Sequence, residues 1–249
     1  MDKKANTWQF HWFVGPDVGV KLYDQKSPLL DTQSDSTIHE HYFGGILGGL
    51  VNYNNLFFQS HIDATFGKGQ SNIKDTQFGI NQYTSLNHYM TTFMTSTGYQ
   101  FKYNNFSFIP GIFNTFVYSI SETKEPIKLG PIDINQIKQK ITQSYAGLSF
   151  INRWHYDKNI SISLRTLFGY IYFNRLQSHA DYSLGNFTNT LTNHRGYYFS
   201  LSMIFAYRSD YGEFLFIPWT AYTYIPNQTD EIDYKLNTLG IKLIYLIGS

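Results

Sequence analysis

Residues 197–207 alternate between two kinds of side chain. One set is large and apolar, and it comprises Tyr197, Phe199, Leu201, Met203, Phe205 and Tyr207. The residues between them are mostly small or polar, such as Ser200 and Ser202. A period of two is the side-chain period of a β-strand, so one face of this segment is apolar and the other mostly is not.

The same alternation returns about ten times along the chain, each time over a length that can cross a bilayer at a tilt, for which about 9–11 residues suffice. The segments lie near residues 8–22, 42–53, 56–66, 89–103, 106–120, 140–155, 160–173, 195–208, 213–225 and 234–246. An even number of antiparallel strands can close into a barrel without a free edge. Pro110 and Pro218 lie inside segments and cannot donate to a strand ladder, so each predicts a bulge or a break.

The composition favours strands that lie in a membrane. Charged residues make up only 15% of the 249 residues and aromatic residues 18%, whereas soluble proteins average about 25% charged residues. No apolar run approaches the ~18 residues of a membrane helix. We therefore predict an all-β fold over residues 1–249, a single antiparallel transmembrane β-barrel with an apolar outer band. A soluble all-β protein is the alternative, but it would need a second layer to cover these apolar faces.

Charge and cysteine content exclude several kinds of site. The net charge of +1 provides no basic stripe that could bind nucleic acid. Cysteine is absent, so a disulfide framework, a thiolate metal site and a thiol nucleophile are excluded. We expect no cofactor and no metal. Residues 1–7 contain no apolar stretch like the core of a signal peptide, and we expect that a signal peptide was removed and Met1 added.

The links between the predicted strands alternate in length. Short, turn-forming links lie at 53–55, 104–105, 157–159 and 209–212, and longer polar links lie near 24–38, 68–86, 121–138, 174–193 and 226–233. Short periplasmic turns and longer extracellular loops are typical of outer-membrane barrels. Both termini are therefore expected on the periplasmic side.

The last predicted strand resembles the C-terminal assembly signal of bacterial outer-membrane barrels. Gly240 is followed by alternating hydrophobic residues that lead through Leu243 to the aromatic Tyr245, after which the chain continues through Leu246–Ser249. The resemblance implies insertion into the bacterial outer membrane. It also implies two partners, the barrel-assembly machinery and outer-membrane lipid, including lipopolysaccharide.

Other stretches are similar to the translocator barrel of autotransporters (type V secretion). They are Gly45–Gly67 with its turn Asn52-Tyr53-Asn54-Asn55, Gly98-Tyr99-Gln100-Phe101 with Phe108-Ile109-Pro110 and Val117-Tyr118, and Tyr145-Ala146-Gly147-Leu148. That family has twelve strands and a linker helix through the lumen. This sequence predicts about ten strands and shows no helical segment.

The alternation turns many charged side chains toward the barrel interior. They are His11, Asp17, Lys21, His61, Asp63, Lys102, Arg153, Arg165, Arg208 and Lys242. Unpaired charges are costly in a low-dielectric interior, so we expect a salt-bridge network that fills a narrow lumen. A polar pathway through the lumen is the alternative. His61 and Asp63 share one strand face, which is more typical of a structural hydrogen bond than of an acid–base pair.

An enzymatic alternative comes from the strand count. Ten-stranded outer-membrane barrels include the omptin proteases, which activate water with an acidic pair on one side of the rim and an Asp/His pair opposite. The chain has His179 and Asp181 in one long link, in reversed order, but only Asp75 where the acidic pair belongs. We therefore predict a non-enzymatic barrel with a structural, adhesive or transport-related role, whose loops could bind a host or surface ligand. An omptin-like protease or another outer-membrane hydrolase remains the alternative.

Overall fold

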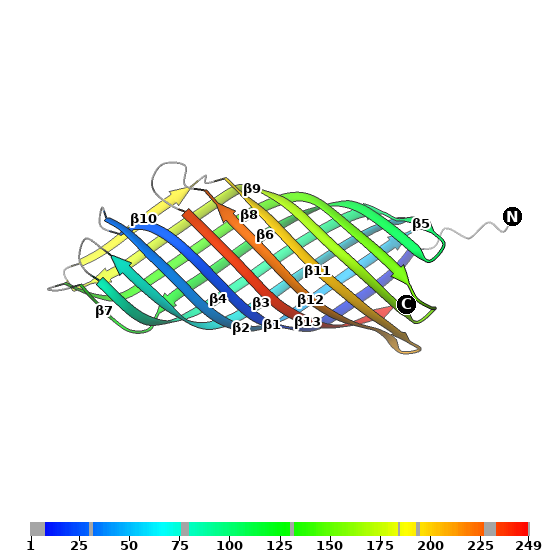
Figure 1. Ribbon diagram of the computed structural model, residues 1–249, viewed down its shortest axis with the longest axis horizontal. Coiled ribbons are helices and arrows are strands. Elements are labelled where there is room, and N and C mark those ends of the chain that lie inside the picture. The colour runs from blue at the N-terminus through cyan, green and yellow to red at the C-terminus, as the bar shows by residue number, and fades with distance from the viewer. Residues whose placement is uncertain are drawn as a thin grey trace.

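The computed structural model describes residues 8–29, 32–75, 80–129, 132–183, 185–192, 195–226 and 233–248. They form a closed antiparallel transmembrane β-barrel of ten strands, elongated along its axis (Figure 1). The elements are β1 (Trp8–Leu29), β2 (Thr32–Tyr53), β3 (Leu56–Asp75), β4 (Ile80–Tyr99), β5 (Phe101–Tyr103), β6 (Phe106–Thr123), β7 (Ile127–Leu129), β8 (Ile132–His155), β9 (Ile160–Tyr182), β10 (Gly185–Thr192), β11 (Gly196–Ser209), β12 (Gly212–Ile225) and β13 (Asp233–Gly248). Among the described residues, no helix is long and apolar enough to cross a membrane.

Each strand of the barrel pairs with its neighbours along the chain, and β1 pairs with β13 to close the ring. The thirteen elements reduce to ten strands of the wall because three of those strands are interrupted. β4 and β5 both pair with β6, β6 and β7 both pair with β8, and β10 and β11 both pair with β9. The even count and the closure that the sequence predicts are therefore confirmed.

The predicted alternation places apolar side chains outside the barrel. On β1, Trp12 is 67% exposed whereas its neighbour Phe13 is 4% exposed. Aromatic pairs lie near the edges of the apolar band, at Trp8–Tyr53 and Phe214–Tyr245 on one side and at Phe66–Tyr89 and Tyr170–Tyr197 on the other. Aromatic rings at both edges of an apolar band are typical of barrels in the outer membrane, where they lie at the lipid–water interfaces.

Both prolines interrupt a ladder, as predicted. Opposite Pro110 the ladder with β6 has a gap between the pairs Gly98–Gly111 and Phe101–Phe108, and the β4–β5 strand breaks at Gln100. At Pro218 the β11–β12 ladder has a gap between the pairs Ser202–Trp219 and Phe205–Phe216. Since proline has no N–H, each site lacks one donor that the ladder requires.

The short turns, the start of β1 and the end of β13 lie at one end of the barrel, as Figure 1 shows. Asn54 and Asn104 adopt left-handed φ values of 55° and 49° in two of these turns, a conformation that asparagine tolerates better than most residues. The longer hairpins lie at the opposite end. This arrangement of short and long connections is the one predicted.

The longer links themselves are mostly strand, which corrects the prediction of loops at 24–38, 68–86, 121–138 and 174–193. β1 continues to Leu29 and β2 begins at Thr32, and they pair residue by residue up to the hairpin end. Most of the link at 226–233 lies outside the described residues. Beyond the lipid the outer face meets water, so these strands lose their apolar alternation while their backbones still pair.

The interior contains an apolar core as well as charges. Phe113 and Val117 of β6 point inward and pack with Tyr145 of β8 and Leu167 of β9. These inward apolar residues explain why the alternation of residues 106–120 is less regular than that of the other segments. The lumen is therefore closed partly by hydrophobic packing.

Candidate functional site

A cavity of about 400 Å³ lies inside the barrel and is lined by every strand of the wall. At the short-turn end its lining includes Asn54 and Asn55 of the β2–β3 turn and Lys102 of β5. At the other end it reaches Tyr145 and Tyr198, whose stacked rings lie 4.5 Å apart. We call this space the lumenal chamber, and its open end faces the short turns.

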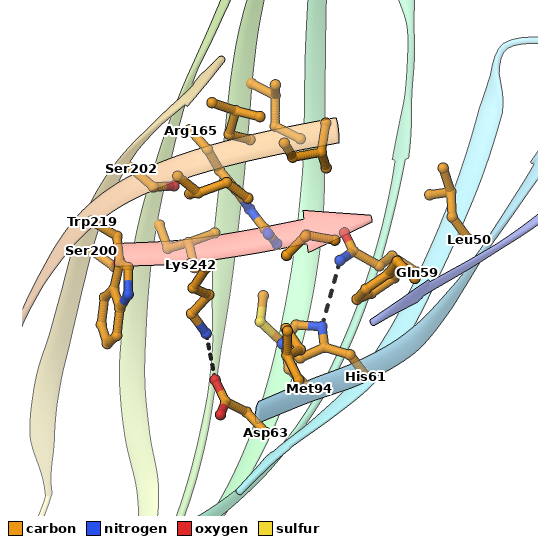
Figure 2. A pocket seen from close by; sticks show the side chains of 18 of the residues that line it. Leu50, Gln59, His61, Asp63, Met94, Arg165, Ser200, Ser202, Trp219 and Lys242 are labelled. Carbon is orange, nitrogen blue, oxygen red and sulfur yellow. Dashed lines mark hydrogen bonds and ion pairs between the residues drawn. The ribbon is translucent and has the colours of Figure 1, made fainter. Parts of the chain in front are cut away.

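Three charged residues meet in the chamber wall. Lys242 of β13 lies between two carboxylates, with its Nζ 3.3 Å from Asp17 Oδ2 and in contact with Asp63 Oδ2. The Tyr42 hydroxyl and Trp219 Nε1 donate to Asp17 Oδ1 over 3.3 Å and 3.2 Å. Figure 2 shows Lys242 reaching across to Asp63 beside Trp219. With two carboxylates and one ammonium, this cluster carries a net charge of −1.

A second network lies farther from the short turns. Lys21 Nζ is 3.3 Å from Glu40 Oε1, and His88 Nδ1 is 2.7 Å from Glu40 Oε2 and 2.9 Å from the Tyr23 hydroxyl. All four side chains are buried. The sequence analysis missed Glu40, which lies just before the predicted segment 42–53, and did not count His88 among the interior charges. Extending the alternation of 42–53 by two residues would have found Glu40, which is buried on the same face as Tyr42.

Arg165 differs from these cations, because it has no carboxylate partner among the described residues. Its Nε and Nη2 atoms are buried and donate to no acceptor among the described residues, although the side chain lines the lumenal chamber. Figure 2 shows the guanidinium pointing into the chamber, away from its own strand and toward His61 and Met94. The guanidinium of Arg165 is therefore a cation in the wall that the protein itself does not neutralise by direct contact.

The other predicted interior residues lie apart from these clusters. His61 Nδ1 is 3.5 Å from Gln59 Nε2, and no described hydrogen bond joins His61 to Asp63. Arg153 Nε donates to Ser163 Oγ over 3.2 Å. The remaining three lie toward the open end, where His11 Nδ1 is buried without a partner, Lys102 lines the chamber and Arg208 pairs with Glu213 over 3.3 Å.

The two residues of the enzymatic alternative lie on the outer face of β9. Tyr172 forms a bulge, because Ser144 pairs with Phe173 and Tyr145 with Ile171. After this extra residue the buried positions are Asn174, Leu176 and Ala180. His179 and Asp181, on either side of Ala180, therefore point away from the lumen, and without the bulge they would have faced it.

The residues predicted for the enzymatic alternative and for the assembly signal do not form a common site in the described part of the structure. His179 Nδ1 lies 2.9 Å from the Thr188 hydroxyl on β10, and the side chain of Asp75 lies outside the described part of the structure. Within that part, no three His, Cys, Asp or Glu side chains are grouped to hold a metal ion. In the assembly-signal stretch, Leu243 faces outward and Gly240 inward, and the Tyr245 hydroxyl donates to the Tyr211 carbonyl.

Comparison with known proteins gives fold neighbours but no sequence relative. A scan against protein-family models finds no match. A search of curated proteins finds no match either. Among solved structures, the outer-membrane protease OmpT from Escherichia coli is similar with a TM-score of 0.68 and 10% identity, and the match covers 100% of both chains.

Two further solved structures resemble the chain at lower TM-scores. The β domain of the Bordetella autotransporter BrkA has a TM-score of 0.36 and 11% identity, covering 92% of this chain and 98% of that one. The COG4313 outer-membrane channel from Pseudomonas putida F1 has a TM-score of 0.40 and 10% identity, covering 100% and 99%. The closed wall of ten strands and the likeness to OmpT show the fold of an outer-membrane β-barrel, as the sequence predicts.

Proposed function

We propose that this chain is a non-enzymatic integral protein of the bacterial outer membrane that presents a rigid rim of β-hairpins for adhesion or surface recognition. The observation that carries the proposal is the length of its strands. β1 and β2 have 22 residues each, β8 has 24 and β9 has 23, whereas about 9–11 residues cross a bilayer. Much of each strand thus projects beyond the membrane on the side opposite the start of β1 and the end of β13.

Contacts between neighbouring hairpins support a rigid rim. The Lys128 backbone N–H of β7 donates to Gln82 Oε1 of β4 over 2.9 Å, and the Thr84 hydroxyl of β4 donates to the Glu125 carbonyl, just before β7, over 3.3 Å. Ile127, Ile134 and Ala180 form a small buried apolar cluster in the same region. A preformed surface loses little conformational entropy when a partner binds, which favours recognition.

The packed interior argues against a transport role. Between the lumenal chamber and the rim, the Lys21–Glu40–His88 network and buried residues such as Ile171 and Tyr234 occupy the lumen. Ten-stranded barrels lie near the small end of the size range, at which side chains can fill the interior. A continuous aqueous path would require these groups to separate.

The hydrolase alternative has less support. It needs His179 and Asp181 to face a substrate groove in the lumen, whereas the bulge at Tyr172 directs both outward. His179 also lies against Thr188, within the β9–β10 hairpin. The likeness to OmpT concerns the fold.

Shortening one hairpin tests the adhesive role. Asp24 pairs with Thr37 across the β1–β2 ladder, so deleting residues 25–36 and joining the two by an Asn-Gly turn keeps the register of the barrel. Cells of a non-adherent Gram-negative host that display the full chain should adhere to epithelial monolayers, and cells with the shortened hairpin should adhere less. The control carries a short insertion in the Asp157–Asn159 turn at the opposite end.

Three results would contradict the proposal. The first is adherence of the full chain no greater than that of host cells lacking it. The second is equal adherence of the shortened variant, provided that it shows heat-modifiable migration on a gel. The third is cleavage of a fluorogenic peptide by the refolded protein that disappears in His179→Ala.

A further inference from the structure

The lumenal chamber is a pocket with one open end. Asn54, Asn55 and Lys102 line it at the short turns. Toward the rim its lining reaches Val117 and Gln143, and beyond them the Lys21–Glu40–His88 network and the buried Tyr234 occupy the lumen. A volume of about 400 Å³ falls within the range of about 300–1,000 Å³ that is usual for small-molecule sites. Because the short turns, the start of β1 and the end of β13 lie at this end, the chamber opens toward the periplasm.

The chamber wall holds a buried cation, Arg165, that has no carboxylate partner among the described residues. Arg165 Nε and Nη2 are buried, have no acceptor among the described residues, and belong to a side chain that points into the chamber (Figure 2). A buried charge without a partner lowers the stability of the folded state, and an oppositely charged partner offsets this cost. A guanidinium presents two parallel donors that match the two oxygens of a carboxylate. An anion placed against Arg165 would satisfy the donors that the protein leaves unpaired.

Arg165 offers one guanidinium, which matches one carboxylate. Lys242 is already held between Asp17 and Asp63, and this cluster keeps a net charge of −1. A dianion such as a phosphate monoester would bring a second negative charge, which Lys242 is not free to pair and which Asp17 and Asp63 in the chamber lining would repel. A monocarboxylate would bind Arg165 and leave the cluster undisturbed.

The rest of the wall is suited to an apolar body. Phe13, Ile46, Ile109, Ile151 and Leu167 all line the chamber, and all five are buried. Sites for organic ligands typically combine such apolar walls with a few polar groups that fix the orientation. We propose that the lumenal chamber binds a small monocarboxylic acid with an apolar body, which enters from the periplasmic end and pairs its carboxylate with Arg165. This site is independent of the rim proposed for adhesion.

Calorimetric titration of the full chain in amphipol with 1-naphthoate tests the site. We expect saturable binding with a Kd of about 0.1 mM, a reasonable affinity for a ligand of this size. The neutral isostere 1-naphthalenemethanol and the dianion 1-naphthyl phosphate should each bind at least about tenfold more weakly, since one lacks the charge-assisted hydrogen bonds and the other adds repulsion.

Two variants with matched controls assign the binding to this chamber. Arg165→Gln should weaken 1-naphthoate binding about tenfold or more, whereas Arg175→Gln, an exposed arginine on the same strand, should not change it. Ser202 lines the chamber and is the ladder partner of Arg165, so Ser202→Phe should block binding while Arg165 is intact. Thr220→Phe, on the outer face of β12, is its control.

The outcomes separate clearly. Absence of 1-naphthoate binding, equal binding of 1-naphthalenemethanol, or tighter binding of 1-naphthyl phosphate would overturn the proposal. Unchanged binding in Arg165→Gln would overturn it too. Heat-modifiable migration identifies the folded variants, and if Arg165→Gln does not fold, Ser202→Phe decides whether the chamber is the site.

Discussion

Asp17 and Lys242 are paired in the ladder that closes the barrel, and their side chains form an ion pair of 3.3 Å across that seam. β1 and β13 are the first and last strands of the chain, so this pair joins its two ends. A shift of one residue in the β1–β13 register would turn Lys242 to the outer face and leave both Asp17 and Asp63 without it. The ion pair therefore favours one register of closure.

Lys242→Met should lower the free energy of unfolding by about 3–5 kcal/mol, because two buried carboxylates would then lack their cation. Urea unfolding in lipid vesicles, followed by tryptophan fluorescence, measures the change. Lys235→Met is the control, since the Lys235–Asp233 ion pair is more exposed and should be worth less than about 1 kcal/mol. Equal midpoints for the two variants would show that the seam pair does not stabilise the barrel.

Gly240→Ala should destabilise the barrel by about 1–3 kcal/mol through overpacking. A Cβ at Gly240 would lie 2.2 Å from the Tyr42 hydroxyl and 2.6 Å from Trp219 Nε1, and both of these groups donate to Asp17. Gly45→Ala is the matched control, since its Cβ would meet nothing closer than 3.5 Å. If the two alanine variants unfold at the same urea concentration, a methyl group at position 240 does not destabilise the barrel by overpacking.

Amide hydrogen exchange should find the hairpin extensions protected. Residues 132–141 of β8 pair with β7 and β9, and residues 173–182 of β9 pair with β8. Such amides exchange only when the hairpin opens, whereas loop amides exchange at once. Exchange measured by mass spectrometry should therefore be slow in these two stretches. The Tyr156–Asn159 turn supplies the fast reference. Fast exchange throughout 132–141 and 173–182 would mean that these residues are loops.

Single cysteines should report a lumen that is open only toward the periplasm, because the chain has no cysteine of its own. Ser202→Cys in the chamber should react with an impermeant maleimide in permeabilised cells but not in intact cells. Ser119→Cys, at a buried position outside the chamber lining, should stay unreactive in both. Tyr83→Cys replaces a residue that is 64% exposed in the β3–β4 hairpin and should react in intact cells. Labelling of Ser202→Cys from outside would indicate a lumen open at both ends.

The ten strands, their inward and outward faces and the location of the short turns could be predicted from the sequence. The alternation arises because one face of each strand contacts lipid and the other faces the lumen. Trp12 on the outer face is therefore exposed, whereas its neighbour Phe13 is buried inside the barrel. The breaks at Pro110 and Pro218 were equally predictable, because a missing N–H is a local property. Outside the lipid this contrast is lost, and the paired extensions were mistaken for loops.

The sequence by itself determined which residues of the membrane-spanning strands face inward, because a period of two needs only neighbouring residues to be recognised. Only the tertiary structure decided which inward charges meet. Lys242 contacts Asp17 and Asp63 through the register of three different strands, while Arg165 is left without a partner. It also decided the direction of His179 and Asp181, since the bulge at Tyr172 inverts the alternation. Register and bulges depend on pairing between distant segments, and a single strand carries no record of them.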